Sequence, residues 1–418
     1  MKKSVIRKAL KSHLFENFVS LGIIQGLNYL LPLITIPFLF NQLGTEKYGL
    51  VNFTFAFIQY FIILTDFGFG LSGTRYIAAN RNDFVKVNRF VNSATISRLI
   101  MASISFFIVL LCVYTIPSLT EYKLFSFLFY GQVIGNALTP TWFFQGMERM
   151  KFNTIIHVTT KTISILPLFV IVQCPQDYLY IPICYSLGSI VAGCLSLLLM
   201  RRTFGVKFYI TSFREVKEVT IDSSRYFLSR ISTSIFTNTN TFLLGLCCGN
   251  VQVGYYSLAD KVHTAVDSLY GPVNGTLFPY MTKNRNLSLY KKILIYGFFA
   301  NLFFITVLFF LLPVVCPVLF KDFSPISMQI IHILLVGNVI SFVNTFIGYP
   351  FLGAYGHPNY CNYSLIGTSI FHIIGLFLLY AIGYMTILNV AWLSVLSSLF
   401  HMVIRIYGVK KYKIWTNN

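Results

Sequence analysis

The sequence predicts an all-α integral membrane protein with twelve membrane-spanning helices. Hydrophobic residues make up 56% of the 418 residues and charged residues only 11%, against roughly 25% charged residues in soluble domains. The apolar residues gather into runs that reach the length of about 20 residues needed to cross a bilayer. In chain order these runs are 18–40, 48–70, 92–116, 123–145, 154–173, 178–200, 226–248, 254–281, 293–319, 328–352, 362–383 and 387–408.

Lys and Arg lie almost entirely on alternate connections between the runs. One set of connections holds 23 of the 32 basic residues, whereas the opposite set holds only Lys47, Lys123 and Lys321. The other six lie within runs or at their edges. Because an excess of Lys and Arg marks cytoplasmic loops, the pattern predicts an even number of spans with both termini in the cytoplasm.

Charge and motif content argue against several classes of function. The net charge of +19 is spread over short loops beside apolar runs, which favours orientation in an anionic membrane over binding to nucleic acid. No phosphate-binding GxxxxGK[ST] loop, metal-ligand spacing or nucleophile with a base partner is present. The sequence therefore predicts a protein that is not an enzyme and holds no metal or cofactor. Any driving force must come from a gradient, of protons or of sodium, or from removal of product.

The longest hydrophilic connection, residues 201–225, lies near the chain midpoint and suggests a duplication. It predicts an N-terminal six-helix lobe over 1–205, a cytoplasmic linker over 206–224 and a C-terminal six-helix lobe over 225–418. Small residues recur about half a chain apart, as expected of two six-helix repeats. The recurring features are Gly44 and Gly49 with Gly249 and Gly254, Gly135-Asn136 with Gly337-Asn338, and Gly146 with Gly353.

The run 254–281 carries the clearest set of ionisable residues inside a predicted span. Polar residues at 256, 260, 263, 267 and 274 share one helical face. Charged groups in a membrane are costly and are expected to face a cavity or a partner. We therefore predict an ion-coupling role for Asp260, His263 and Asp267. The alternative is that the stripe packs against other helices and that His263 and Asp267 form a closed local pair.

Three further runs carry polar residues at helical spacing, and these are predicted to line a substrate cavity. The residues are Gln25 and Asn28 in 18–40, Asn52 and Gln59 in 48–70, and Arg230 and Thr237 in 226–248. Hydrogen bonding between helices is the competing interpretation for the neutral ones. Arg98 and Lys161 lie about two turns inside their runs and, with Arg230, are predicted to contact an anion such as a phosphate. The alternative interpretation is that these side chains snorkel, so that their charged ends reach the membrane–water interface.

Several motifs resemble those of the Wzx-type O-antigen flippases of the MATE-like exporter superfamily. In the first half they are NYLLPL at 28–33, PFL at 37–39, LGTEKYG at 43–49, DFGF at 66–69, TRYIA at 74–78 and WFFQGMERM at 142–150. In the second half they are VGYY at 253–256, ADK at 259–261 and FP at 278–279. The resemblance runs from about residue 20 to the end and is strongest before residue 150.

The resemblance implies two six-helix lobes around a central cavity lined mainly by helices 1, 2, 7 and 8. It implies alternating access that carries undecaprenyl-diphosphate-linked oligosaccharide from the cytoplasmic to the periplasmic leaflet of the bacterial inner membrane. The implied partners are this lipid-linked sugar, membrane lipids, and an O-antigen polymerase with its chain-length regulator, but no nucleic acid. No basic cavity residue of the family can be aligned with a residue of this chain.

Two other functions remain open on the sequence alone. A small-molecule or drug exporter of the same superfamily would share the fold, although inward basic residues disfavour cationic drugs. A membrane enzyme such as an O-antigen polymerase would need sizeable outward loops for catalysis. The predicted outward loops hold about ten residues or fewer, which disfavours the enzyme.

Overall fold

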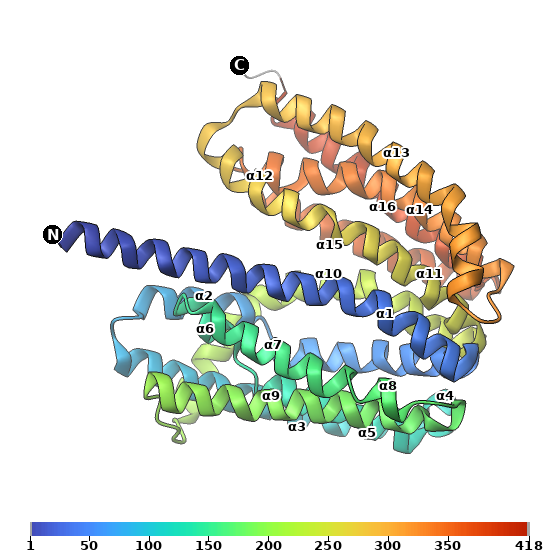
Figure 1. Ribbon diagram of the computed structural model, residues 1–418. Coiled ribbons are helices and arrows are strands. Elements are labelled where there is room, and N and C mark those ends of the chain that lie inside the picture. Colours follow the sequence, from blue (N-terminus) through green and yellow to red (C-terminus); the bar gives the residue numbers. More distant parts are fainter. Residues whose placement is uncertain (1, 416–418) are drawn as a thin grey trace. The chain divides into compact units, whose positions relative to one another are not determined.

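The computed structural model describes residues 2–415, with side chains described at 19–20, 22–227, 231 and 238–415. Within these residues the chain forms helices joined by turns, with no strand (Figure 1). The elements of the first half are α1 (Lys2–Asp66), α2 (Phe69–Asn80), α3 (Phe84–Thr115), α4 (Pro117–Thr120), α5 (Lys123–Ala137), α6 (Thr141–Gly146), α7 (Met150–Ile165), α8 (Leu168–Ile171), the 3₁₀ turn η1 (Pro175–Leu179) and α9 (Tyr180–Phe204).

The second half continues the helical pattern. Its elements are α10 (Phe213–Cys248), α11 (Asn250–Ser268), α12 (Tyr270–Asn284), α13 (Leu287–Leu319), α14 (Pro325–Ile347), the π-helical turn η2 (Gly348–Gly353), α15 (Pro358–Ala381) and α16 (Ile387–Lys411).

Each of the twelve predicted runs coincides with helical structure. The first two runs both lie in α1, which is two helices that meet at Gly44 (φ 70°, ψ 169°). Among the described residues, eight stretches are long and apolar enough to cross a membrane, and the first, Gly22–Asn80, overlaps both of these runs. The remaining runs correspond to α5, which is short, to α10, which is polar, and to α11 with α12, which are separated by a break.

The chain divides into two compact units. We call Met1–Leu43 with Thr54–Ser234 the N-terminal unit, and Gly44–Phe53 with Ile235–Asn418 the C-terminal unit. Residues 206–224, predicted as a linker, are extended only to Ser212, because α10 begins at Phe213. The capping pair Ser212 and Glu215 starts this helix, with Ser212 N donating to Glu215 Oε2 at 3.2 Å.

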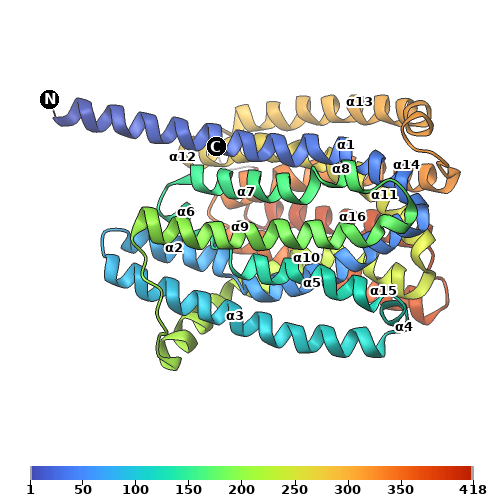
Figure 2. The same cartoon turned by 60° about the horizontal axis from the view of Figure 1, so that its bottom comes forward.

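Glycines allow α5 and α9 of the N-terminal unit to pack closely (Figure 2). A Cβ at Gly131 or Gly135 of α5 would overlap Ser186 or Ser189 of α9. The spacing of these two glycines is that of a GxxxG motif, which lets helix backbones approach in a membrane. At one end of the unit, Trp142 packs edge-on to Phe90 with ring centroids 5.6 Å apart. The motif WFFQG thus forms a core rather than a binding surface.

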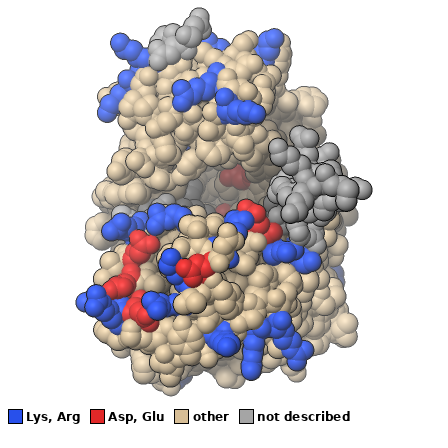
Figure 3. Space-filling model, turned by 90° about the vertical axis from the view of Figure 1, so that its left-hand side faces the viewer, with Lys and Arg blue, Asp and Glu red and all other residues tan. Residues whose placement is uncertain are grey.

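The connections α2–α3, α6–α7 and α9–α10 meet at one end of the N-terminal unit, as the alternation of basic loops requires. Ion pairs join them, Arg81 to Glu148 at 2.7 Å and Arg89 to Glu215 at 3.3 Å. Figure 3 shows Lys and Arg gathered at this end, with the few acidic side chains among them. The hydrogen bond from Arg81 lowers the pKa of Glu148, so this carboxylate stays charged at neutral pH.

The repeat suggested by the glycine spacing has a structural counterpart. Gly249 (φ 84°, ψ 170°) ends α10 in nearly the same conformation that Gly44 adopts between the two helices of α1. Five residues later in each repeat, a Cβ at Gly49 would overlap the backbone of Asn250, and one at Gly254 would overlap the carbonyl oxygen of Thr45. The two turns therefore pack against each other reciprocally, within the C-terminal unit.

Candidate functional site

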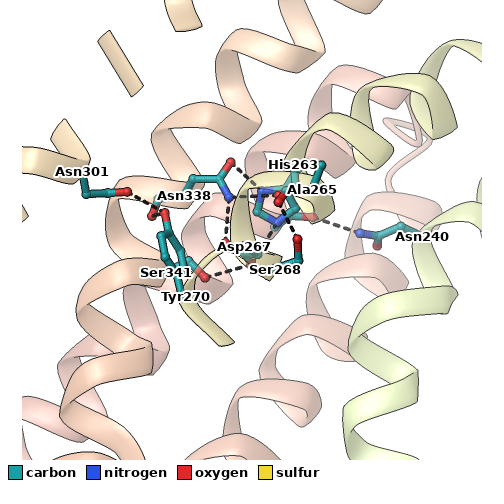
Figure 4. Close-up of polar contacts among 10 residues, drawn as sticks. Asn240, His263, Ala265, Asp267, Ser268, Tyr270, Asn301, Asn338 and Ser341 are labelled. Atoms are coloured by element: carbon teal, nitrogen blue, oxygen red, sulfur yellow. Dashed lines mark hydrogen bonds and ion pairs between the residues drawn. The ribbon is translucent and has the colours of Figure 1, made fainter. Parts of the chain in front are cut away.

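The polar face predicted on residues 254–281 lies on α11 and faces α14, all within the C-terminal unit. Asp267 is the centre of this cluster (Figure 4). Its Oδ1 accepts a hydrogen bond from Asn338 Nδ2 at 2.7 Å, and its Oδ2 accepts one from Ser341 Oγ at 3.1 Å. The Asp267 side chain is 34% exposed, whereas Asn338 is fully buried. Two donors on α14 therefore hold the Asp267 carboxylate, while part of the carboxylate stays exposed.

His263 is oriented by the same asparagine. Asn338 donates its amide NH2 to Asp267 and to the His263 carbonyl oxygen, the latter at 3.1 Å, so its Oδ1 is the atom that faces His263 Nδ1 at 2.9 Å. Since an amide oxygen only accepts, Nδ1 must carry a hydrogen. The other ring nitrogen, Nε2, lies 3.8 Å from Asp267 Oδ2. A proton gained or lost by the imidazole is therefore exchanged at Nε2, beside the carboxylate.

A second layer supports the cluster from α12 and α13. The hydroxyl of Tyr270 contacts Asn301 Oδ1 at 2.8 Å and the Asn338 carbonyl oxygen at 3.2 Å. Both side chains are buried. Hydrogen bonds of this kind fix the orientation of the residue that they support. This layer therefore limits the movement of Asn338.

Asp260, the third predicted ion-coupling residue, is half-buried one helical turn before His263. It is attracted to Lys261 and His263 and repelled by Asp267. The structure thus brings Asp260, His263 and Asp267 into one electrostatic group on α11. Their ion-coupling role stays a prediction, because no bound ion tests it.

A closed polar network lies deeper in the C-terminal unit. Asn240 of α10 donates to the Tyr256 hydroxyl and to Ser394 Oγ, both at 2.9 Å, and its Oδ1 lies 2.8 Å from His372 Nε2. His372 is fully buried. The network ties α10, α11, α15 and α16 together, which gives His372 a packing role.

Arg98 of the N-terminal unit is buried, with 2% of its surface exposed. Its guanidinium donates to the carbonyl oxygens of Thr139 at 3.1 Å and Asn136 at 2.7 Å, and to Asn136 Oδ1 at 3.1 Å. Asp66 attracts it electrostatically. These contacts satisfy carbonyl groups at the end of α5 and favour a structural role. The predicted phosphate contact remains untested.

Replacing Arg98 with Met is expected to lower the thermal unfolding midpoint of the purified protein. The variant loses three hydrogen bonds from a charged donor. The two carbonyl oxygens keep one backbone donor each, whereas Asn136 Oδ1 loses its donor, at a cost of about 1–3 kcal/mol. Thermal unfolding in detergent measures the change, with Arg202→Met in the exposed last turn of α9 as control. An unchanged midpoint together with lost transport would instead identify Arg98 as a substrate contact.

The other predicted substrate-binding residues are not brought into one cluster by the contacts described. Lys161 is half-buried on α7, near His157. Gln25 and Asn28 are exposed on α1, whereas Gln59 is half-buried. Asn52 donates to the Tyr48 carbonyl oxygen at 2.9 Å. The side chains of Arg230 and Thr237 lie outside the described residues.

Sequence reasoning missed Asn240 and Ser341, and it noted Asn338 only as a mark of the repeat. Asn338 lies 202 residues after Asn136, and both asparagines hold a charged partner on a neighbouring helix. That internal match was the available signal for Asn338. Ser341 carries no comparable signal, because a serine three residues along an apolar helix is common in packing.

Comparison with known families decides the affiliation. Residues 14–285, more than half of the chain, match the family described as "Polysaccharide biosynthesis protein". The chain belongs to this polysaccharide biosynthesis protein family. It is also 26% identical over 286 residues to a protein of Escherichia coli (strain K12) named "Putative O-antigen transporter", with 68% of this chain and 69% of that protein covered.

Solved structures show that this family member has a MATE-like fold. It is similar to the inward-facing conformation of a multidrug resistance MATE family transporter of the MOP superfamily, with TM-score 0.64 and 13% identity over 96% of this chain and all of the other. It is equally similar to the lipid II flippase MurJ, inward closed, with TM-score 0.64 and 15% identity over 96% and 88% of the two chains.

These findings confirm the predicted polysaccharide-transporter family and the MATE-like fold class. The family member is a multi-pass membrane protein, as its apolar helices predict. The prediction that the chain is not an enzyme agrees with the comparisons, because the relative and one structure are named as transporters and the other structure as a flippase.

Proposed function

We propose that this family member is a flippase for undecaprenyl-diphosphate-linked O-antigen repeat units. It moves them from the cytoplasmic to the periplasmic leaflet of the bacterial inner membrane, and both of its termini are cytoplasmic. The observation that carries the proposal is the family match combined with a fold shared with a lipid-linked sugar flippase. The name of the Escherichia coli relative supports the same substrate class.

Transport is proposed to follow alternating access, with the lipid tail in the bilayer and the diphosphate and sugars on a polar route. Gln25, Asn28, Asn52, Gln59 and Thr237 are proposed to face that route. Lys161, Arg230 and Arg98 are proposed to contact the diphosphate, although the two terminal nitrogens of Arg98 also donate to carbonyl groups. Delivery to an O-antigen polymerase and its chain-length regulator follows from the periplasmic product.

Proton coupling is proposed to occur at His263 and Asp267. Asn338 fixes the hydrogen on Nδ1, so one proton at Nε2 converts a neutral imidazole beside a carboxylate into an ion pair. Sodium fits less well, because hard cations prefer oxygen ligands, whereas Asp267 faces an amide NH2 and an imidazole beside the Ser341 hydroxyl. Alternate exposure of this pair to the two sides would link proton movement to the conformational cycle.

Deleting the gene in its host tests the proposed function. Lipid-linked repeat units are expected to stay in the cytoplasmic leaflet, so that a membrane-impermeant diol-cleaving reagent cannot modify them in spheroplasts. Expression of this chain should restore both their accessibility and O-antigen on the cell surface. Accessible repeat units in the deletion strain would refute the proposal. A change in drug susceptibility without any change in O-antigen would favour the small-molecule exporter.

A further inference from the structure

An extended segment between α9 and α10 carries exposed apolar side chains on the basic end of the N-terminal unit. In residues 205–214, Phe208 is 43% exposed, Tyr209 47%, Ile210 92% and Phe213 78%. Large apolar side chains exposed together in this way mark an interaction surface. The segment is the loop that leaves the left end of α9 in Figure 2 and continues into the first turn of α10.

The segment is rigidly held rather than being a loose connection. Asn92 of α3 donates its Nδ2 to the Lys207 carbonyl oxygen at 2.8 Å and accepts from Tyr209 N at 3.0 Å. Asn88 Oδ1 accepts from Lys207 N at 3.0 Å. Both asparagines are buried. Two buried side chains thus bind the backbone of the segment and leave Phe208, Tyr209 and Ile210 exposed, whereas Val206 and Thr211 are buried.

The attachment places the segment at the depth where the apolar part of α3 begins. Gly205 ends α9 in a left-handed conformation (φ 70°), and Val206 N returns to the Met200 carbonyl oxygen at 3.2 Å, which reverses the chain. The segment then crosses α3 at Asn88 and Asn92, where the apolar run 92–116 starts. A small hollow beside it is lined by Thr95, Ile96 and Phe208 to Ile210.

Charge around the segment is mainly positive. Lys207 and Arg214 are exposed within it, and Arg201, Arg202 and Lys217 flank it. The acidic neighbours are Glu215, paired with Arg89, and Glu218, which accepts from Arg214 at 3.0 Å. The Arg214 pair is highly exposed on both sides and therefore weak. Basic residues beside exposed aromatic and aliphatic ones are typical of segments that lie in the interface of an anionic membrane.

We propose that residues 205–214 form a membrane-interface anchor on the lipid leaflet at the basic end of the protein. Phe208, Tyr209, Ile210 and Phe213 insert among the outer part of the acyl chains, while Lys207 and Arg214 bind anionic headgroups. The assignment of this leaflet as cytoplasmic rests on the proposed function, whereas the insertion itself does not. The anchor fixes the α9–α10 connection to the bilayer surface.

Fluorescence in proteoliposomes tests the anchor. In an Ile210→Trp variant, the added emission, taken as the difference from the parent chain, is expected to shift to the blue. It is also expected to be quenched by phosphatidylglycerol that carries bromine on its acyl chains. The matched control is Asn284→Trp, at the exposed basic end of α12, whose added emission should remain water-like. Equal quenching of both variants, or of neither, would overturn the proposal.

The headgroup contact is tested by adding Lys207→Gln and Arg214→Gln to the Ile210→Trp variant. Quenching by brominated phosphatidylglycerol should fall to the level seen with brominated phosphatidylcholine, which should itself change little. If the two lipids quench the Ile210→Trp variant equally while Lys207 and Arg214 are still present, the proposed binding of anionic headgroups is wrong. Emission that shifts only when a soluble protein extract is added would point to a protein partner instead. None of these results depends on transport, so the anchor and the flippase proposal fail separately.

Discussion

Replacing Asp267 with Asn is expected to reduce O-antigen display strongly while leaving the amount and fold of the protein unchanged. Asn has the same shape and its oxygen still accepts from Asn338 or Ser341, so the α11–α14 contact is retained. The side chain no longer carries a charge or exchanges a proton with His263 Nε2. Loss of 1–3 kcal/mol of coupling corresponds to about a 5- to 150-fold effect. Lipopolysaccharide gels and accessibility of repeat units in spheroplasts measure the loss.

The matched control for this prediction is Asp322→Asn. Asp322 is an exposed acid in the turn between α13 and α14 and has positive φ (53°). Asn adopts this left-handed conformation readily, so the control should display O-antigen normally. Normal display by the Asp267 variant would show that proton exchange at this carboxylate is not needed. Loss of display with loss of protein would instead assign Asp267 a structural role.

Alanine at Gly49 or at Gly254 is expected to destabilise the protein strongly. The new Cβ at Gly49 would overlap the Asn250 carbonyl oxygen, and that at Gly254 would overlap the Thr45 carbonyl oxygen. Backbone atoms cannot rotate aside as a long side chain can, so the two turns must separate. Overpacking of this kind costs about 1–3 kcal/mol or more. The thermal unfolding midpoint of each purified variant measures the effect.

Gly275→Ala is the matched control for both glycines. Gly275 lies within α12 of the same unit, and a Cβ there would meet nothing within 4 Å. Alanine should therefore stabilise the helix by about 0.5–1 kcal/mol relative to glycine. Because the two overlaps lie on one contact, the double Gly49→Ala and Gly254→Ala variant should lose less than the sum of the single losses. Full additivity, or an unchanged midpoint in the single variants, would contradict the reciprocal packing.

The fold was largely predictable because membrane-spanning helices appear in a sequence as long apolar runs. All twelve runs coincide with helices, and the basic loops that alternate in sequence meet at one end of the N-terminal unit. Hydropathy could not locate interruptions within a run. The run 254–281 is two helices that meet near Leu269, and the run 123–145 is broken before Pro140.

The polar start of α10 was also missed. Residues 213–224 have the composition of a linker, yet they form a helix that packs on α2 and α3. Ser223 bonds to Ser72 at 2.7 Å, and Thr220 bonds to Ser97 at 2.6 Å. Contacts between small hydroxyl side chains that lie far apart in the sequence leave no pattern from which they could be predicted.

The candidate site was predictable in part. Helical spacing placed His263 and Asp267 on one face, because spacing along a single helix is enough for that inference. Their partners Asn338 and Ser341 come from a helix some seventy residues later, and no pattern in one sequence reports which helices are neighbours. Arg98 shows the converse limit. A basic residue in a span predicts a polar surrounding, but it does not tell whether that surrounding is a ligand or a helix end.

The paired asparagines of α5 and α14 suggest how duplicated halves could diverge. Asn136 turns its oxygen towards the cation of Arg98, whereas Asn338 turns its NH2 towards the anion of Asp267. A carboxamide offers both polarities at one position, so a descendant copy can accept a neighbour of opposite sign without rebuilding the scaffold. After a duplication, one copy could thus hold a cation and the other a carboxylate with the same side chain.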